Sequence, residues 1–271
     1  MMHSTGDLTG FRAIVSGGGG SGIGASAVEK LVARGAEVHV LDLRAPNSAV
    51  ASFQDVNLSN PDAIASAVQA VGGTVDALFN CVGVAGNTTT PLETMAINYV
   101  GVRELSDAVL PLMRPGSSIT TIASRGGSAW PARLETWLEL AATDRFSGAI
   151  EWLLAHPTEY LSAYGASKEA ISVWTMYSAV TLGALGIRSN AIMPGPTHSP
   201  MYEQFYETTS KAYMDAFPVP LGRPQTVSEQ AEALVFLGSA AASGITGTLL
   251  HVDGGTNAGL ITSLIKLPAV V

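Results

Sequence analysis

Residues 16–24 read Ser-Gly-Gly-Gly-Gly-Ser-Gly-Ile-Gly, and this stretch decides the fold. It follows a β-rich run at residues 12–16 and opens a helical pattern at residues 23–34. Glycines at a strand-to-helix turn let the backbone approach a pyrophosphate, which binds at the helix N-terminus. A P-loop is excluded, because no Gly-Lys-Ser/Thr closes the stretch. We therefore predict a dinucleotide-binding turn, with a flexible turn as the alternative.

The rest of the chain alternates short β-rich runs with helical patterns, the order expected of parallel β-α units. The further predicted strands are residues 37–41, 75–80, 117–122, 188–192 and 248–252. The further predicted helices are residues 61–71, about 98–113, 162–185 and 227–238. No linker, repeat or low-complexity tract interrupts this order. We predict an α/β fold over residues 1–271, a single-domain Rossmann-type doubly wound parallel sheet with helices on both faces. Such a sheet binds its ligand at the carboxyl ends of its strands.

The composition narrows the class of protein. Of the 271 residues 47% are apolar and 13% charged, and the net charge is −8 with scattered basic residues, which argues against nucleic-acid binding. The single cysteine, Cys81, is expected to pack in the core and fits a reducing cytoplasm. Residues 1–11 show no signal peptide, and no apolar run is long enough for a membrane span. We also predict no metal site, because the spacing of four of the histidines does not suit one; they are His3, His39, His156 and His251.

Tyr164 and Lys168 are the strongest catalytic candidates. They lie four residues apart in a predicted helix and therefore share one face. A nearby ammonium favours the phenolate, so we expect Lys168 to lower the pKa of Tyr164 and make it a proton donor and acceptor. Tyr160 is a rival, but no lysine follows it at that spacing.

Asp42 ends the second predicted strand, where a carboxylate can bond the adenosine ribose hydroxyls. Its charge repels a 2′-phosphate, which predicts NAD rather than NADP as cofactor. Arg44 would partly counter that repulsion. An ordinary turn carboxylate is the alternative.

Two segments are longer than connections normally need, residues 125–161 and about 199–220. Long loops over a rigid scaffold often carry binding function. Their aromatic residues either form a core for added helices or line a pocket for a large apolar substrate, such as a steroid, terpene or aryl alcohol. These residues are Trp130, Trp137, Trp152, Tyr202, Phe205, Tyr206, Tyr213 and Phe217.

Three polar residues of these segments have open roles. Arg125 and Arg133 either meet an anionic substrate group or are solvated loop charges. His198 is either a substrate contact or a wall residue.

At this point the chain resembles the short-chain dehydrogenase/reductase family. Gly18, Gly22 and Gly24 match its Thr-Gly-x-x-x-Gly-x-Gly turn, although Gly17 stands where threonine is usual. Further similar segments follow in the family's order. They are Asp55-Val56, Asn80-Cys81-Val82-Gly83, Ile97-Asn98-Tyr99, Ser124, Pro194-Gly195 with Ser199, and Val252-Asp253-Gly254-Gly255.

The resemblance implies roles for these positions. Ser124 would bond the substrate oxygen, although it could instead cap a strand. Asn98 would position a water that links Lys168 to solvent, although it could instead tether a helix to a strand. The catalytic set is thus Ser124, Tyr164, Lys168 and Asn98. The expected cofactor-binding set is Gly18, Ser21, Gly22, Ile23, Gly24, Asp42, Asp55, Val56, Asn80, Val82, Gly83, Tyr164, Lys168, Pro194, Gly195, Thr197 and Ser199.

An insertion indicates to which branch of the family the chain is similar. Ser124 and Tyr164 are 40 positions apart, and the insertion lies between them. This gap resembles the bacterial 3-alpha-hydroxysteroid dehydrogenase/carbonyl reductase group and its coniferyl-alcohol dehydrogenase relatives. In that group the insertion is thought to obstruct the usual four-helix subunit contact, which implies a homodimer, or otherwise a homotetramer, formed through residues 227–252.

The predicted protein is a cytoplasmic, NAD-dependent alcohol or ketone oxidoreductase, acting on a small molecule without a nucleic-acid or membrane partner. A lyase or dehalogenase on the same fold is less consistent with the sequence, since the glycine turn and Lys168 are both present. A non-catalytic dinucleotide-binding protein is the remaining alternative, but it would not need Ser124, Tyr164 and Lys168 together.

Overall fold

The structure is a computed structural model, and it describes residues 6–208 and 211–268. Its centre is a seven-stranded parallel sheet in the order β3-β2-β1-β4-β5-β6-β9. The strands are β1 (Arg12–Ser16), β2 (Glu37–Asp42), β3 (Ser52–Asp55), β4 (Val75–Asn80), β5 (Met113–Ile122), β6 (Arg188–Pro194) and β9 (Leu249–Val252). The strand order reverses between β1 and β4, where a doubly wound sheet opens a crevice for its ligand.

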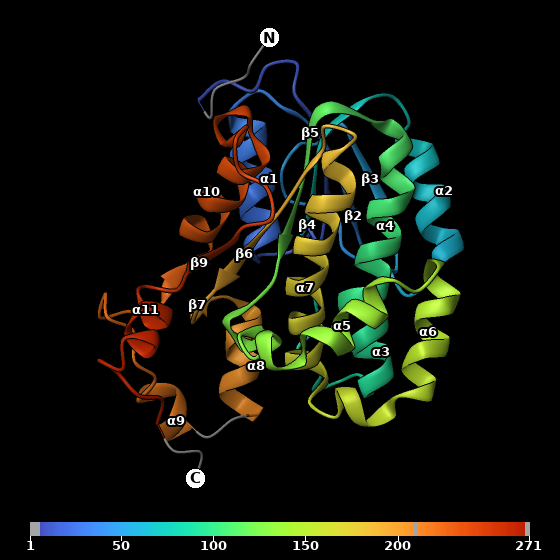
Figure 1. Cartoon of the computed structure of the whole chain (residues 1–271). Helices are drawn as coiled ribbons and strands as arrows, with labels where there is room; N and C mark the ends of the chain where they lie inside the picture. Colours follow the sequence, from blue (N-terminus) through green and yellow to red (C-terminus); the bar gives the residue numbers. More distant parts are fainter. Residues whose placement is uncertain (1–5, 209–210, 269–271) are drawn as a thin grey trace.

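Helices cover both faces of the sheet, as predicted (Figure 1). One face packs against α1 (Ile23–Ala33) and α10 (Val227–Gly238). The other packs against α2 (Pro61–Val71), α4 (Gly101–Val109) and α7 (Ala163–Gly183). Each face buries its own cluster of apolar side chains, and the prediction of a Rossmann-type doubly wound fold is confirmed.

The inserted residues 125–161 form two helices, α5 (Leu134–Ala141) and α6 (Arg145–Ala155), which pack against α7 and α4 respectively. Trp137 is fully buried there, and its Nε1 donates to Oε2 of Glu169 on α7 at 2.8 Å. Trp130 and Trp152 pack against the same core. The tryptophans therefore form the core of the insertion, which was one of the two predicted alternatives.

Arg103 of α4 ties the insertion down from the other side. Its buried guanidinium donates to the carbonyl oxygens of Leu140 and Arg145 and to Oγ1 of Thr143. Because α7 lies between the sheet and α5, it is buried on most of its circumference.

The predicted helix at residues 98–113 differs from the structure. A helix, α3 (Pro91–Met95), begins earlier, because Thr90 and Glu93 form a capping box and Pro91 suits the first helical position. A π-helical turn (Ala96–Val100) follows, then α4 and a 3₁₀ turn (Leu110–Leu112). β5 consequently begins at Met113, four residues before the predicted start.

Several short elements at the carboxyl ends of the strands were not predicted. β7 (Thr197–His198) and β8 (Gln225–Thr226) pair in parallel, and α8 (Pro200–Thr208), α9 (Lys211–Asp215) and α11 (Thr256–Ile261) lie below the sheet in Figure 1. Among the described residues, no helix has the length and apolar character that crossing a bilayer requires.

Candidate active site

A cavity of about 680 Å³ opens at the carboxyl ends of the central strands. The glycine turn and Asp42 line it together with Ser124, Tyr164 and Lys168. The remaining predicted site residues on its wall are Val56, Val82, Gly83, Pro194, Gly195, Thr197 and Ser199. The structure therefore brings most of the predicted cofactor residues and three of the four predicted catalytic residues into one cleft.

The glycine turn fits tightly against its neighbours. Gly17 has φ +72°, and a Cβ there would lie 2.6 Å from the backbone of Cys81. A Cβ on Gly24 would lie 2.1 Å from the carbonyl oxygen of Gly17. This conformation explains why glycine occupies position 17, since an L side chain would be strained there.

The start of α1 is open to a ligand. Its N-cap, Gly22, supplies no side-chain hydrogen bond, and its first turn contains no acidic residue. The unsatisfied N–H groups of a helix start bind an anion, as a pyrophosphate would require.

Asp42 both braces this turn and faces the cavity. Its Oδ2 accepts from the Gly19 amide at 2.8 Å, and its Oδ1 accepts from the Arg44 amide at 3.1 Å. Leu43, which is 63% exposed, and Arg44 also line the cavity. The carboxylate thus braces the turn, which was one of the predicted alternatives, and also lines the cavity, so its ribose-binding role stays a prediction.

Ser124, Tyr164 and Lys168 converge from β5 and α7. Ser124 follows the end of β5, and its Oγ accepts from the Gly126 amide at 3.0 Å. Nζ of the buried Lys168 donates to the carbonyl oxygen of Ile122 at 2.8 Å. Ser124 therefore caps the following 3₁₀ turn, as the alternative expected, and also stands on the cavity wall beside Tyr164.

The pKa of Tyr164 does not follow the prediction made from the sequence. Burial raises the pKa of Tyr164, and the hydrogen bond with the Ser124 side chain only partly offsets this. Burial also lowers the pKa of Lys168 to about 8. The prediction that Lys168 lowers the Tyr164 pKa is wrong for this structure, because Nζ bonds Ile122 and lies 5.9 Å from the Tyr164 ring centroid.

Asn98 lies in the π-helical turn, outside the cavity wall. Its Oδ1 accepts from the Val84 amide at 2.8 Å, and its Nδ2 donates to Val84 O at 2.9 Å and to Ser167 Oγ at 3.1 Å. The side chain therefore tethers the segment after β4 to α7. The water-holding role of Asn98 stays a prediction.

Three other predicted residues also lie off the wall. Gly18 packs behind the turn, where a Cβ would lie 2.8 Å from Val28. Asn80 is buried, and its Nδ2 donates to Ser106 Oγ at 2.9 Å. Asp55 is exposed at the end of β3.

The loop after β6 is held by α10. Thr197 Oγ1 donates to Gly195 O at 2.9 Å and accepts from Gln230 Nε2 at 3.0 Å. The same Nε2 donates to Val252 O at 2.7 Å, so one buried glutamine connects this loop to β9.

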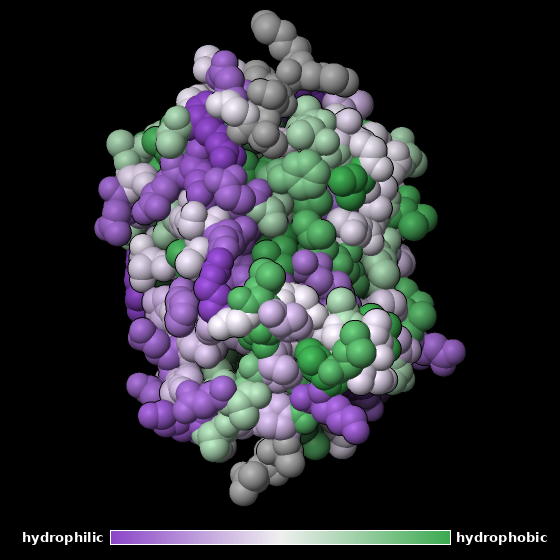
Figure 2. Space-filling model, turned by 90° about the vertical axis from the view of Figure 1, so that its left-hand side faces the viewer, coloured by the Kyte–Doolittle hydropathy of each residue, from purple (hydrophilic) through white to green (hydrophobic). Residues whose placement is uncertain are grey.

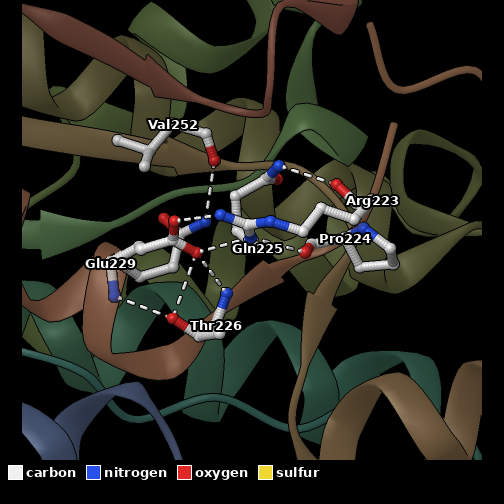
Figure 3. Close-up of polar contacts among 7 residues, drawn as sticks. Arg223, Pro224, Gln225, Thr226, Glu229 and Val252 are labelled. Carbon is white, nitrogen blue, oxygen red and sulfur yellow. Dashed lines mark hydrogen bonds and ion pairs between the residues drawn. The ribbon is translucent and has the colours of Figure 1, made fainter. Parts of the chain in front are cut away.

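Figure 3 shows how the start of α10 is fixed. Thr226 and Glu229 form a capping box, and Arg223 binds both carboxylate oxygens of Glu229 at 2.6 and 2.9 Å. The backbone N–H of Gln225 donates to Pro196 O at 2.9 Å. This bond connects the start of α10 to the loop that contains Gly195 and Thr197.

Aromatic residues of the 199–220 segment cover the substrate side. The Phe205 ring meets the Tyr164 ring edge-on, with centroids 4.9 Å apart. Tyr202, Tyr213 and Phe217 also line the cavity, together with Met201 and Met214, whereas the tryptophans do not. Each of the two predicted alternatives therefore holds for one group of aromatic residues: the tryptophans of the insertion form a core, and the aromatic residues of the 199–220 segment line the pocket.

The remaining candidates lie away from the reaction centre. His198 is exposed, with its ring 5.8 Å from that of Tyr202, and does not line the cavity. Tyr160 is buried in the core. Arg133 pairs with Glu159 and Glu169 and does not line the cavity. Arg125 lines the cavity.

Sequence reasoning missed several wall residues. Some of them follow β3 or β4, so their position after a strand end could have revealed them; they are Asn57, Leu58, Val84, Ala85, Asn87 and Thr88. Others, such as Ile97, Met201, Gln204 and Met214, lie in helical segments and carry no such signal. In the described parts of the chain, no group of three or more His, Cys, Asp or Glu could hold a metal ion.

Comparisons with known proteins agree with this architecture. A family model described as enoyl-(acyl carrier protein) reductase matches residues 18–135 and 155–257, and the gap between the two matches falls in the insertion. The chain is 33% identical over 245 residues to the coniferyl-alcohol dehydrogenase of Pseudomonas sp. strain HR199, covering 90% of this chain and 96% of that protein. It is 30% identical over 254 residues to the 3-alpha-hydroxysteroid dehydrogenase/carbonyl reductase of Comamonas testosteroni, with the same coverage of 90% and 96%.

A solved structure is similar over almost the whole chain. The 3-alpha-hydroxysteroid dehydrogenase of Pseudomonas sp. B-0831, complexed with NADH, has a TM-score of 0.77 and 29% identity, covering 94% of this chain and all of that one. The relatives are oxidoreductases that act on alcohols. With the glycine turn, Ser124, Tyr164 and Lys168 in one cleft, this chain belongs to the short-chain dehydrogenase/reductase family.

Proposed function

We propose that the protein is an NAD-dependent oxidoreductase that interconverts a secondary or aryl alcohol and its carbonyl compound. The observation that carries this proposal is the convergence of Ser124, Tyr164 and Lys168 on one cavity with the glycine turn. A protein that only binds a dinucleotide, or only binds a hydroxyl compound without reacting it, would not require all of these groups together.

The residues of the cleft fit a nicotinamide dinucleotide. The uncapped start of α1 suits the pyrophosphate, and the close-packed glycines leave room that a side chain would fill. Asp42 would accept from the adenosine ribose hydroxyls, which favours NAD over NADP. Pro194, Gly195 and Thr197 would hold the nicotinamide end, and the bound nicotinamide would supply the hydride chemistry.

The chain's own residues supply proton transfer and orientation. In the reducing direction, Tyr164 donates its proton to the carbonyl oxygen, and its raised pKa keeps that proton available. Ser124 donates a hydrogen bond to the same oxygen, where negative charge develops. Lys168, whose ammonium is held by Ile122 O on the cavity wall, would bond the nicotinamide ribose.

The substrate is proposed to have a bulky apolar body, such as a hydroxysteroid. Phe205, Tyr202, Tyr213 and Phe217 form an apolar wall beside Tyr164. The relatives named for coniferyl alcohol and for 3-alpha-hydroxysteroids support the same class, and an aryl or terpene alcohol is the alternative.

We further propose a homodimer formed through α10 and β9. β9 is the edge strand of the sheet, and all four of its residues are half-buried. Figure 2 looks onto the side of the molecule where these elements lie and shows an apolar area beside a hydrophilic one. α5 and α6 cover α7 and α4, so the face formed by α4 and α7 is not available for a contact between subunits. Location in a reducing cytoplasm, inferred from the single cysteine, stays a prediction.

The test is absorbance of reduced nicotinamide with NAD and, separately, NADP, against hydroxysteroids, terpene alcohols and aryl alcohols. Tyr164→Phe should lower turnover by about 100-fold or more, because the proton donor is lost. Its binding of NADH, followed by fluorescence, should stay near that of the wild type. Tyr160→Phe is the matched control, since Tyr160 lies in the core and away from the cavity. Equal turnover in Tyr164→Phe and the wild type would favour a non-catalytic dinucleotide-binding protein.

A further inference from the structure

Arg125 is unusual among the arginines that the structure describes. It follows Ser124 directly, lines the cavity and is half-buried. Its guanidinium lies over the Phe217 ring, 4.6 Å from the centroid. Within residues 6–208 and 211–268, no carboxylate or carbonyl oxygen accepts a hydrogen bond from it.

The other buried or half-buried arginines all have acceptors. Arg103 and Arg188 donate to carbonyl oxygens, and Arg133 pairs with two glutamates. Arg44 and Arg145, for whose side chains no hydrogen bond is found, are exposed and can be solvated by water. Among the described arginines that are buried or half-buried, Arg125 is therefore the one for whose guanidinium no hydrogen-bond acceptor is found, whereas Arg34, which has one unpaired nitrogen, still bonds Glu232.

Asp253, an acid that acts on Arg125 electrostatically, does not use these donors. Asp253 attracts Arg125 through space, but its two oxygens accept from the amides of Gly255 and Asn257 at 3.0 and 2.7 Å. Those bonds commit the carboxylate to the start of α11. Tyr213 also acts on Arg125 electrostatically, and no hydrogen bond joins the two among the described residues.

The contact with Phe217 leaves the N–H donors of the guanidinium without an acceptor. The aromatic face attracts the cation through the charge of the ring's π-system, while the planar guanidinium keeps its donors in a fork. That fork matches a carboxylate through two parallel hydrogen bonds. Burial lowers the pKa of Arg125, so the charge is held at a cost that an anionic ligand would offset.

We propose that Arg125 binds a carboxylate of the substrate, so that the preferred substrate is an alcohol or ketone with an apolar body and an anionic group. The inference rests on the proposed function and narrows its substrate class. Ser124 and Tyr164 hold the reacting oxygen, and Arg125, the next residue along, holds the substrate at a second point. Two fixed points orient a bulky substrate, as positioning for hydride transfer requires.

The experiment compares each acid with its methyl ester. The probes are 4-(1-hydroxyethyl)benzoate and a 3-hydroxysteroid with a side-chain carboxylate, each with its ester. Initial rates with NAD give the ratio of kcat/KM for acid over ester in the wild type, Arg125→Met, Arg125→Lys, Phe217→Leu and Arg114→Met. Calorimetry measures binding of 4-acetylbenzoate and its methyl ester, with and without NADH.

For at least one pair, the wild-type ratio should favour the acid, and Arg125→Met should lower that ratio by about tenfold to hundredfold, the usual range for a charge-assisted bond. Arg125→Lys should restore part of the ratio, because it keeps the charge but loses the fork. Phe217→Leu removes the ring that holds the guanidinium and should lower the ratio less than Arg125→Met does, because the charge and its donors remain. Arg114 is exposed and pairs with Asp76, so Arg114→Met controls for net charge and should leave the ratio unchanged.

Equal losses for acid and ester in Arg125→Met would overturn the inference, since Arg125 would then only hold Phe217 in place. A wild type that turns over the esters but never prefers the acids would also overturn it, while the proposed function would stand. If the wild type binds 4-acetylbenzoate more tightly than its ester, and Arg125→Met does not, the inference stands even where no alcohol is oxidised. In that case the proposed function fails by itself.

Discussion

The burial of Lys168 predicts a pH dependence of stability that a single substitution should remove. Lys168 is 3% exposed, and the hydrogen bond found for its ammonium is the one to Ile122 O. Burial lowers its pKa from the ordinary 10.5 to about 8. The folded protein therefore releases this proton at a lower pH than the unfolded chain.

The sign follows from proton binding. From about pH 8 to about pH 10.5 the unfolded chain holds the lysine proton while the folded protein does not, so folding becomes more favourable as pH rises. Below about pH 8 both states are protonated, and the folded state bears the full cost of the buried charge. The shift from 10.5 to about 8 corresponds to about 3.4 kcal/mol. About 2.5 kcal/mol of this should be regained between about pH 7 and about pH 10.

The assay is urea unfolding of the wild type and Lys168→Met, followed by tryptophan fluorescence at several pH values in that range. The free energy of unfolding of the wild type should gain about 2.5 kcal/mol relative to the variant. Loss of the bond to Ile122 shifts the variant by the same amount at every pH and does not change this difference. Two parallel curves, agreeing within about 0.5 kcal/mol after a constant offset, would refute the argument, since Lys168 would then keep its ordinary pKa.

Two further predictions concern the cofactor turn. Asp42→Ala should raise the ratio of kcat/KM for NADP over NAD by about tenfold or more, because the charge that repels a 2′-phosphate is gone and Arg44 remains. An unchanged ratio would show that Asp42 only braces the turn. Gly17→Ala should lower the free energy of unfolding by about 3 kcal/mol, because an alanine there adds backbone strain and overlaps with Cys81. Gly20→Ala is the control and should lower it by about 1 kcal/mol, because Gly20 also has a positive φ, +71°, but faces open space. Similar losses for the two variants in urea unfolding would contradict the role of close packing.

The architecture could be predicted because it follows from local patterns. A strand, a glycine turn and a helix define one β-α unit, and their repetition leaves few topologies other than a doubly wound sheet. The predicted strands match β1, β2, β4, β6 and β9 closely. β3 was missed because Ser-Phe-Gln-Asp has no apolar pattern, which an edge strand does not need.

The π-helical turn could not be predicted, because it results from tertiary contacts. Asn98 bonds both backbone groups of Val84 and also Ser167 on α7. These partners come from two other elements, so the spacing of residues 96–100 does not predict them. The same limit applies to the pKa of Tyr164. Helix spacing predicts that Lys168 shares a face with Tyr164, but it does not predict that the ammonium bonds Ile122 O on another element, and the pKa of Tyr164 is raised by burial.

Two of the arginines of the insertion, Arg125 and Arg133, show most clearly what the structure adds. From the sequence, Arg125 and Arg133 had the same alternatives, because both are charges in one long segment. Arg133 finds Glu169 on α7, a partner 36 positions away, and the pair holds α5 against that helix. Asp253, just after β9, attracts Arg125 through space, but no hydrogen bond joins the two side chains, and the carboxylate accepts from two amides instead. A charge becomes structural when a distant segment bonds it directly. Arg125 has no such bond within the described residues, and its donors are available to a ligand that enters beside Ser124.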